Sequence, residues 1–358
     1  MITSVKLILI YLYSIAQTFA QVKNKVNINF IAEKSGYSVS TVSRVINKCA
    51  KEYRISNNAR TKILKISDKY GYHANPVAVN LRVKRSHTLG LLVPDLENPF
   101  FVNLVRVINS KFGEKGYCTI VKETKDNAEE ERKGLNELIE RNIDGIMLVP
   151  SIFADENGAY IEEIIKKGVP LICVDRYIDN TNIPYVVTDN EKGAYKAVSY
   201  LIQKGHKKIA CIQGLESSSP CRDRKQGYIN ALKDAGLKPF YIGGNEFNLK
   251  CGYEEACKLL SNNQKPTAIF AMSSTIALGV IKAIKEFGLS MPDDISLFGF
   301  DNNIFLDFLA VPLTTVAQPV EVIGEKVAEY LILSIKKVLN DEWKNITVEP
   351  KLIIRESV

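Results

Sequence analysis

A run of small polar residues around one arginine has the side chains that read DNA bases. The candidate base-reading residues are Val39, Ser40 and Arg44, within a DNA-contacting set of Ser38, Val39, Ser40, Thr41, Ser43, Arg44 and Asn47. Small side chains let a helix approach base edges closely, and an arginine can donate two hydrogen bonds to O6 and N7 of one guanine. The chemistry that this run predicts is recognition of a DNA sequence in the major groove.

Helix-capping signals place this run on the second of three short helices. Asn27 is a candidate N-cap of a first helix that Gly36 ends, and Ser38 is a candidate N-cap of a second helix over residues 39–47. Apolar spacing predicts a third helix over residues 57–70. Two helices joined by a glycine-containing turn form a helix-turn-helix, whose second helix enters the major groove. The pattern alone also fits an ordinary small helical bundle with solvated lysines.

The charge of the chain favours the DNA-binding interpretation. The 358 residues carry a net charge of +7, but residues 23–87 contain fourteen Lys or Arg against three Asp or Glu. The remainder from residue 88 onward is therefore net negative. This asymmetry indicates a small module that binds a polyanion, attached to a larger body that does not.

The larger body shows alternating strand and helix patterns. Apolar runs at residues 89–93, 145–149 and 268–271 predict buried strands, and residues 127–141 and 192–204 predict helices between strands. This alternation predicts an α/β fold with parallel sheets covered by helices on both faces. Because the region is long for a single sheet, we expect two lobes with a ligand cleft between them.

Other classes of protein lack their signals in this sequence. Since there is no P-loop, no strand-linked GxGxxG, no GxSxG elbow and no HExxH motif, we expect no enzyme and no cofactor. The seven cysteines contain no CxxC pair and the three histidines lie far apart, so we expect neither a disulfide framework nor a metal centre. Scattered thiols of this kind are typical of the reducing cytoplasm.

Residues 1–22 form an apolar N-terminal extension with two interpretations. Residues 5–20 are nearly continuous apolar sequence behind Lys6, which is the pattern of a signal peptide or an anchor. The run is short for a membrane span, which needs about 20 apolar residues. Alternatively, translation starts at Val22, in which case the extension is not part of the working protein.

The segment GYSVSTVSRVIN at residues 36–47 resembles the recognition-helix signature of the LacI/GalR family of lactose-repressor-type regulators. The resemblance extends over residues 23–356. Its other motifs include ISNNAR at 55–60, VPDLENPFF at 93–101, VDR at 174–176, GFDN at 299–302 and LTTVAQP at 313–319. The headpiece departs from the family pattern at Phe30, where the family has an acidic residue, and in a longer loop over residues 48–54.

The resemblance implies a domain organisation. A helix-turn-helix headpiece is expected at 23–72, a hinge at 73–87 and a periplasmic-binding-protein-like core, which binds effector and dimerises, at 88–358. Within the core, lobe 1 is expected at 88–188 and 316–346, and lobe 2 at 189–315 and 347–358. In the hinge, Leu81 is expected to wedge into the minor groove at the centre of the operator.

The resemblance also implies an effector site between the lobes. The residues carried over to it are Asn98, Phe100, Asp175, Arg176, Arg224, Phe247, Ser273, Asp301 and Gln318. Carboxylates and arginines bond hydroxyls, and aromatic rings cover the apolar face of a sugar, so the expected effector is a carbohydrate. Ser273 and Ser274 replace the family's Asn and Asp, which predicts a less hydroxylated, anionic or weakly bound ligand.

These observations predict a cytoplasmic, ligand-responsive transcription regulator, a repressor as is most common in the family. It is expected to bind a near-palindromic double-stranded DNA operator as a homodimer or higher oligomer. No membrane partner is expected unless residues 1–22 are translated as part of the protein. The alternative is a secreted or membrane-anchored sugar-binding protein, which has the same two-lobed body but no use for residues 23–87.

Overall fold

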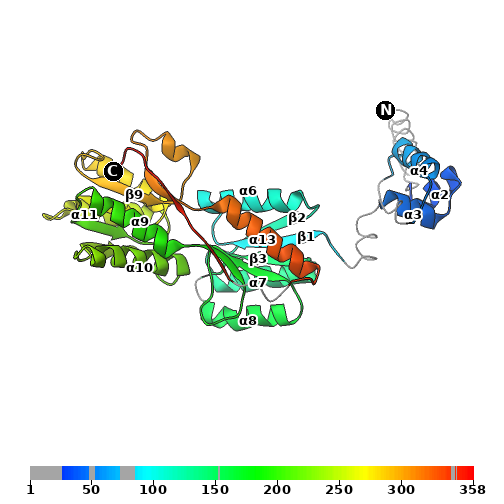
Figure 1. Cartoon of the computed structure of the whole chain (residues 1–358), viewed down its shortest axis with the longest axis horizontal. Coiled ribbons are helices and arrows are strands. Elements are labelled where there is room, and N and C mark those ends of the chain that lie inside the picture. The colour runs from blue at the N-terminus through cyan, green and yellow to red at the C-terminus, as the bar shows by residue number, and fades with distance from the viewer. Residues whose placement is uncertain (1–25, 48–52, 73–84, 152–153, 340–342, 344) are drawn as a thin grey trace, which may run out of the picture. The chain divides into compact units, whose positions relative to one another are not determined.

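The computed structural model describes residues 26–47, 53–72, 85–151, 154–339, 343 and 345–358 (Figure 1). The chain divides into two compact units, Met1–Arg85 and Ser86–Val358. The apolar extension and nearly all of the expected hinge lie outside the described residues. Among the helices that are described, none has the length and apolar character needed to cross a bilayer.

The first unit contains the three expected helices, α2 (Ile28–Ser35), α3 (Val39–Ile46) and α4 (Asn57–Lys69). The predicted caps are confirmed, since Asn27 Oδ1 accepts a hydrogen bond from the Phe30 amide and Ser38 Oγ accepts one from the Thr41 amide. Gly36 ends α2 with φ of 74°, a left-handed conformation that glycine adopts without steric cost. The turn from α2 into α3 is therefore specified by local chemistry.

A small apolar core joins these three helices. Ile31 of α2, Val42 and Val45 of α3, and Ile63 of α4 are almost completely buried. Phe30 packs against this core, and its ring meets the Tyr70 ring edge-on, with 5.1 Å between the ring centres. The aromatic residue that departs from the family pattern thus adds a contact between the first and third helices.

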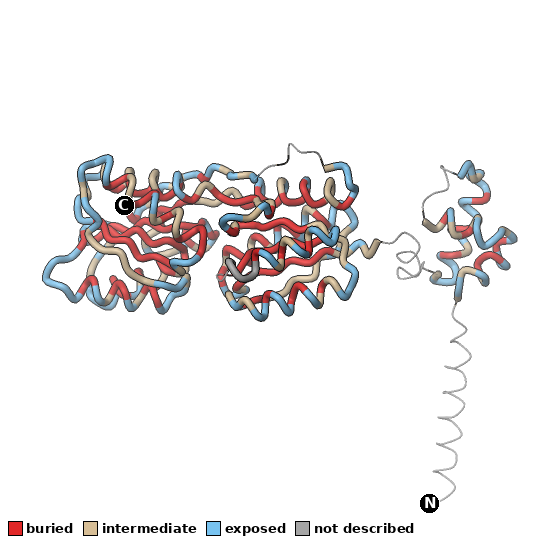
Figure 2. The backbone as a smooth tube through the Cα atoms, turned by 90° about the horizontal axis from the view of Figure 1, so that it is seen from below, coloured by how far each residue is buried: buried red, intermediate tan, exposed pale blue. Residues whose placement is uncertain are grey.

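The second unit contains two six-stranded sheets, each with helices on both faces (Figures 1 and 2). The first sheet has the order β11-β5-β4-β3-β1-β2 and is parallel throughout. Its strands are β1 (Thr88–Val93), β2 (Cys118–Glu123), β3 (Gly145–Leu148), β4 (Leu171–Val174), β5 (Tyr185–Thr188) and β11 (Ile346–Val348). Its helices are α6 (Pro99–Gly113) and α13 (Val320–Ile335) on one face, and α7 (Ala128–Glu140) and α8 (Ala154–Lys166) on the other.

The second sheet has the order β12-β10-β9-β8-β6-β7, in which only β12 runs antiparallel to its neighbour. Its strands are β6 (Ile209–Ile212), β7 (Tyr241–Gly243), β8 (Ala268–Ala271), β9 (Ser296–Phe300), β10 (Thr314–Ala317) and β12 (Lys351–Ile353). The helices around it are α9 (Asn190–Gln203), α10 (Ser219–Asp234), α11 (Leu249–Ser261) and α12 (Ser274–Glu286), with a 3-10 turn η1 (Ile304–Asp307) after β9. The expected α/β class with two sheet-centred lobes is confirmed.

The chain passes between the lobes after β5, after β10 and after β11. Two of the expected lobe boundaries, 315/316 and 346/347, need correction by two residues each. β10 stays in the second sheet through Ala317 because it remains paired with β9 and β12, and β11 belongs to the first sheet through Val348. A strand's pairing partner, which decides the boundary, is not visible in its own sequence.

Candidate functional site

The exposed face of α3 carries the residues that the sequence predicts to read bases. Val39, Ser40 and Arg44 are exposed, whereas Val42 and Val45 are buried in the headpiece core. This division follows from the helical period, which separates the two sets of positions onto opposite sides. An α-helix with small side chains and one arginine on its open face has the dimensions and donors for the major groove.

Hydroxyl groups fix the start of α3. Ser38 Oγ lies 2.8 Å from both the Ser40 and the Thr41 hydroxyl oxygens, and it also accepts the Thr41 amide at 3.2 Å. At the other end, the Asn47 side-chain amide donates to the Ser43 hydroxyl at 3.2 Å. The predicted residues thus lie together on α3 and its two ends, and Ser38 has a structural role as the cap.

Two further features concern the predicted DNA-contacting residues. The guanidinium carbon of Arg44 lies 4.1 Å from the centre of the Tyr53 ring, a contact that the sequence did not predict. Leu81, the expected minor-groove wedge, lies outside the described residues.

A pocket within the second unit is lined by residues of both lobes. The residues around it are Asn98, Phe100, Phe101, Asp175, Arg176, Pro220, Arg224, Phe247, Ser273, Asp301 and Gln318. All nine residues expected at the effector site are among them. The sequence reasoning missed Phe101 and Pro220, although Phe101 directly follows Phe100 in the quoted VPDLENPFF motif and Pro220 lies in the first turn of α10.

Two aspartates enter this pocket from equivalent places in the two lobes. Asp175 directly follows β4 and Asp301 directly follows β9, with φ of 65° and 71°. Ligands of parallel α/β sheets bind at such carboxyl ends of strands. Left-handed backbone is uncommon for residues other than glycine and is concentrated at functional sites, although aspartate tolerates it better than most. The backbone strain is therefore located where the two carboxylates face the pocket.

Burial controls the ionisation of both carboxyl groups. Desolvation raises the pKa of Asp175 to about 6, although Arg176 and Arg224 favour its ionised form. Desolvation also raises the pKa of Asp301, against the opposing effects of Arg224 and of the hydrogen bond from Gln318. A ligand that hydrogen-bonds the ionised forms would compensate for this lost solvation.

Arg224 is held rigidly in the wall of the pocket. Its Nε donates to Asn190 Oδ1 at 2.8 Å and its Nη1 donates to the Met272 carbonyl at 2.5 Å. The guanidinium also stacks on the Phe300 ring, 3.7 Å from its centre. One face of the Arg224 guanidinium and two of its N–H donors are already engaged. Its remaining N–H groups can therefore bind a ligand with little further loss of rotamer freedom.

Gln318 links the pocket to two of the passages between lobes. Its Nε2 donates to Asp301 Oδ1 at 2.7 Å, and its Oε1 accepts from the Thr188 hydroxyl at 2.5 Å. Thr188 ends β5 and Gln318 follows β10, so each belongs to a different inter-lobe segment. Gln318 therefore connects Asp301 in the pocket wall to both segments.

Two buried polar atoms of the pocket lack partners in the protein. Among the described residues, neither Asp175 Oδ1 nor Arg176 Nε has a hydrogen-bond partner, although both side chains are almost completely buried. An unpaired buried polar atom costs free energy of about 1–3 kcal/mol. One acceptor and one donor left open in the same pocket match a ligand that both donates and accepts, as a hydroxyl group does.

Ser273, which departs from the family pattern, is committed to the helix that it begins. Its hydroxyl caps α12 by accepting from the Ile276 amide at 3.1 Å and lies 2.9 Å from the Thr275 hydroxyl. The Asn303 side-chain amide in turn donates to the Ser274 hydroxyl. Both serine hydroxyls therefore have intramolecular partners.

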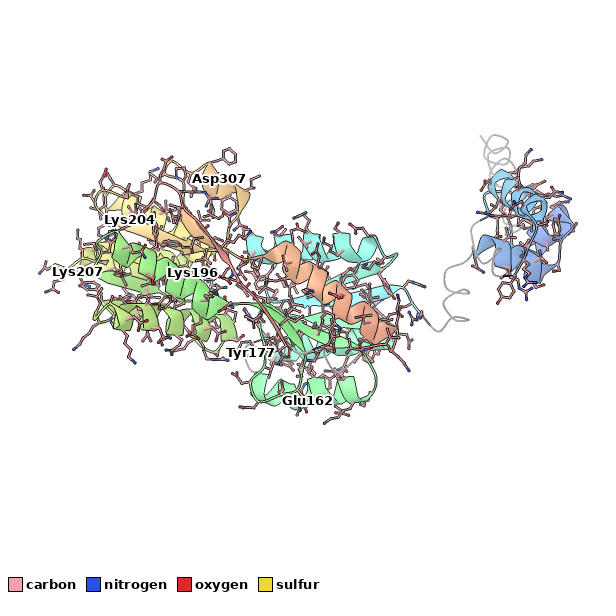
Figure 3. The ribbon with its side chains drawn as sticks, viewed as in Figure 1. Glu162, Tyr177, Lys196, Lys204, Lys207 and Asp307 are labelled. Carbon is pink, nitrogen blue, oxygen red and sulfur yellow. The ribbon has the colours of Figure 1, made fainter. Side chains whose placement is uncertain are left out.

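A polar latch, defined as the contacts of Tyr177 and Asp179 with the start of α10, joins the lobes. Tyr177 is labelled in Figure 3, at the junction of the two lobes. The Tyr177 hydroxyl donates to Asp223 Oδ1 at 3.0 Å, and its backbone amide donates to the Ser219 hydroxyl at 3.0 Å. Arg222 forms an ion pair with Asp179. The sequence reasoning missed this latch, which holds the two lobes together at the cleft.

Comparisons with known proteins cover nearly the whole chain. Residues 86–356 match the family described as periplasmic binding proteins and sugar binding domain of LacI family, and residues 27–75 match bacterial regulatory proteins of the lacI family. The regulator DegA of Bacillus subtilis is 33% identical over 335 residues, covering 93% of this chain and 98% of DegA. The ribose operon repressor of Haemophilus influenzae is 31% identical over 330 residues, covering 92% and 97%.

Solved structures give the same result. The lac repressor dimer bound to operator and the anti-inducer ONPF has a TM-score of 0.84 at 25% identity, covering 93% of this chain and 98% of that one. A LacI family regulator from Enterococcus faecium with bound ribose has a TM-score of 0.67 at 29% identity, covering 75% and 98%. With both units matched in sequence and in fold, the chain belongs to the LacI family of bacterial regulatory proteins.

Proposed function

We propose that this LacI-family regulator is a cytoplasmic, homodimeric repressor of a near-palindromic operator. Its affinity for this DNA changes when a carbohydrate enters the pocket between its lobes. The observation that carries the proposal is the division of α3, with Val39, Ser40 and Arg44 open to solvent above a buried apolar face. The same chain holds a pocket in which a buried donor and a buried acceptor have no partner within the described part of the chain. A DNA reader and a ligand sensor in one chain are the two parts of an allosteric repressor.

On DNA, we assign base reading to α3. Val39 and Ser40 contact base edges near the start of the helix, and Arg44 bonds a guanine. Ser38, Thr41, Ser43 and Asn47 support this surface through its caps and neighbouring contacts. The basic residues of the headpiece neutralise phosphates, which gives affinity that falls with salt but reads no sequence. Leu81 remains the proposed minor-groove wedge.

In the pocket, the proposed ligand is a carbohydrate or a close derivative. Asp175 and Arg176 offer an open acceptor and an open donor, and Phe100 and Phe247 supply apolar ring faces. Relatives support the class, since one solved member of the family holds ribose and the regulator CelR was solved with cellobiose. We infer that the charged groups of the pocket bind ligand rather than perform a reaction on it.

We also propose that the working unit is a dimer. A headpiece of three short helices offers one small reading surface, so two copies are needed for a specific site. The second lobe presents two large apolar side chains to solvent around η1, Ile304 at 80% and Phe308 at 81% exposure. The lac repressor, which this chain resembles, was solved as a dimer on its operator. A second copy of the chain is the proposed cover for this apolar pair.

A gel-shift experiment with the full chain tests the proposed function. The probe is the DNA upstream of the chain's own gene, in the presence of excess non-specific competitor. Arg44→Ala should abolish the competitor-resistant shift, because one bidentate arginine–guanine contact is worth about 1–3 kcal/mol of discrimination. Arg141→Ala, an exposed arginine of the second unit, is the matched control and should bind as the unaltered chain does. Full specificity in Arg44→Ala would contradict the proposal.

The rival interpretation, a secreted or membrane-anchored sugar-binding protein, shares the two-lobed unit. It is not favoured, because residues 27–75 match the DNA-binding part of the LacI family and fold into the corresponding helices.

A further inference from the structure

Tyr53 places an aromatic ring against the arginine proposed to read a base. The guanidinium carbon of Arg44 lies 4.1 Å from the centre of the Tyr53 ring, well inside the distance of about 6 Å at which a cation and an aromatic face attract. Both side chains are exposed on the headpiece. Tyr53 lies near the end of the segment over residues 48–54, which is longer than the family pattern that the sequence resembles.

The backbone after Tyr53 is fixed at that point of the headpiece. Arg54 has a left-handed conformation with φ of 51°, which turns the chain sharply before α4. Ile55 packs against the apolar core of the headpiece, and Ser56 caps α4 by accepting from the Ala59 amide at 3.3 Å. The Tyr53 ring is thus attached to a segment that is anchored by both packing and a helix cap.

The stack leaves the hydrogen-bonding edge of the arginine available. A guanidinium is planar and carries its five N–H donors around its rim, so an aromatic ring against its face does not occupy them. An unsupported arginine loses rotamer freedom when it binds, whereas one already held against a ring loses less for each hydrogen bond formed. A stacked Arg44 therefore has both its donors and a reduced entropic cost of binding.

We propose that Tyr53 is a positioning residue for base recognition, which holds Arg44 in the orientation that contacts a guanine. This inference rests on the proposed function, in which α3 reads the operator. Tyr53 acts through Arg44, so its contribution is to specificity at the base pair that Arg44 contacts. The longer loop is then the element that supplies a supporting ring beside the recognition helix.

The test uses the full chain and the DNA fragment that it retains in the gel-shift experiment, together with fragments in which each G·C pair is replaced in turn. Tyr53→Leu removes the aromatic face while keeping an apolar side chain, and Tyr53→Phe keeps the face while removing the hydroxyl. Tyr53→Leu should weaken specific binding by roughly two- to fivefold, as expected for an exposed cation–π contact. It should also reduce discrimination at one G·C pair and leave non-specific binding unchanged, whereas Tyr53→Phe should behave as the unaltered chain.

A double-mutant cycle with Arg44→Ala makes the result decisive. If Tyr53 acts through Arg44, Tyr53→Leu has no further effect on the residual affinity of Arg44→Ala for the same fragment, which is measured by direct titration without competitor. Equal losses in both backgrounds, a loss in Tyr53→Phe as large as in Tyr53→Leu, or tighter specific binding by Tyr53→Leu would each overturn the inference. Specific binding that survives Arg44→Ala would contradict the proposed function itself, whereas a loss in Arg44→Ala without one in Tyr53→Leu would contradict only the role of Tyr53.

Discussion

Asp175 shows how a single residue connects the chemistry of the pocket to its strain. Its backbone is left-handed, its side chain is buried, and one of its oxygens has no partner among the described residues. Each of these features is unfavourable in an isolated chain. Their combination at the end of β4, beside Arg176 and opposite Asp301, is the arrangement expected of a residue kept for a ligand rather than for stability.

The raised pKa of Asp175, about 6, predicts a pH-dependent ligand affinity. The ionised carboxylate accepts a ligand hydroxyl, and a smaller fraction of Asp175 is ionised at pH 5 than at pH 7. Affinity for a bound pentose or hexose should therefore rise by up to roughly tenfold from pH 5 to pH 7, one tenfold change per pKa unit at most. Titration calorimetry with a panel of these sugars measures it.

Asp175→Asn provides the control for this prediction. The variant should bind more weakly at pH 7 and lose the rise between pH 5 and 7. If the affinity of the unaltered chain instead falls from pH 5 to pH 7, the protonated Asp175 carboxyl donates a hydrogen bond to the ligand. Without ligand, the sign for stability is the opposite: a carboxyl whose pKa is raised on folding stabilises the fold at low pH, and this contribution is lost as pH rises through about 6.

The residues of the pocket were largely predictable, and those of the latch were not. Six of the nine expected residues lie in quoted motifs that resemble the LacI family, so they could be carried over by position, whereas Ser273 stands where the sequence departs from the family pattern. Tyr177 and Asp223, by contrast, meet through contact between a loop of lobe 1 and a helix of lobe 2. The Tyr53–Arg44 contact was missed for the same reason, because side-chain packing across a turn has no periodic signal in the sequence.

At the scale of elements, glycines set the approach of α11 and α12. A methyl group at Gly279 would lie 2.1 Å from the Leu249 carbonyl oxygen, and one at Gly252 would lie 2.1 Å from the Ile276 carbonyl oxygen. Since these are backbone atoms, neither helix can yield by turning a side chain. The two helices pack closely because each presents a glycine to the other's backbone.

Gly279→Ala should therefore destabilise the second unit. The added methyl group forces the two helices apart. By analogy with overpacked cores, this lowers the free energy of unfolding by roughly 1–3 kcal/mol or more. The matched control is Gly113→Ala at the end of α6, where an added methyl group has no atom within 4 Å. That variant should be neutral or stabilising by about 0.5–1 kcal/mol, since alanine favours a helix more than glycine does. Thermal unfolding followed by circular dichroism measures both, and equal midpoints would refute the packing argument.

Elements with strong local signals were predicted well. The caps at Asn27 and Ser38 follow from side-chain type, and buried strands such as β1, β3 and β8 follow from their apolar runs. The strands β7, β10, β11 and β12 were missed. β7, β11 and β12 are half-buried or exposed, whereas β10 is buried but begins with two threonines and so carries no continuous apolar run. Their assignment depends on pairing with strands distant in the chain, which also explains the corrected lobe boundaries.

At the scale of the whole molecule, the asymmetry of charge corresponds to the two structural units of the chain. The basic residues 23–87 include the helix-turn-helix, and the net negative remainder forms the two-lobed unit with its pocket. Gln318 bonds both Asp301 in the pocket and Thr188 at another inter-lobe segment, so it connects the pocket wall to two of the segments that pass between the lobes. A ligand that favours one arrangement can change DNA affinity, typically through about 1–3 kcal/mol of coupling.

Selection of DNA from a random double-stranded pool by the full chain tests the central claim most directly. A dimer that reads bases with α3 should enrich one near-palindromic sequence, with two half-sites related by twofold symmetry and a G·C pair in each that Arg44→Ala no longer selects. Recovery of no preferred sequence, or of one that Arg44→Ala enriches equally well, would contradict the account.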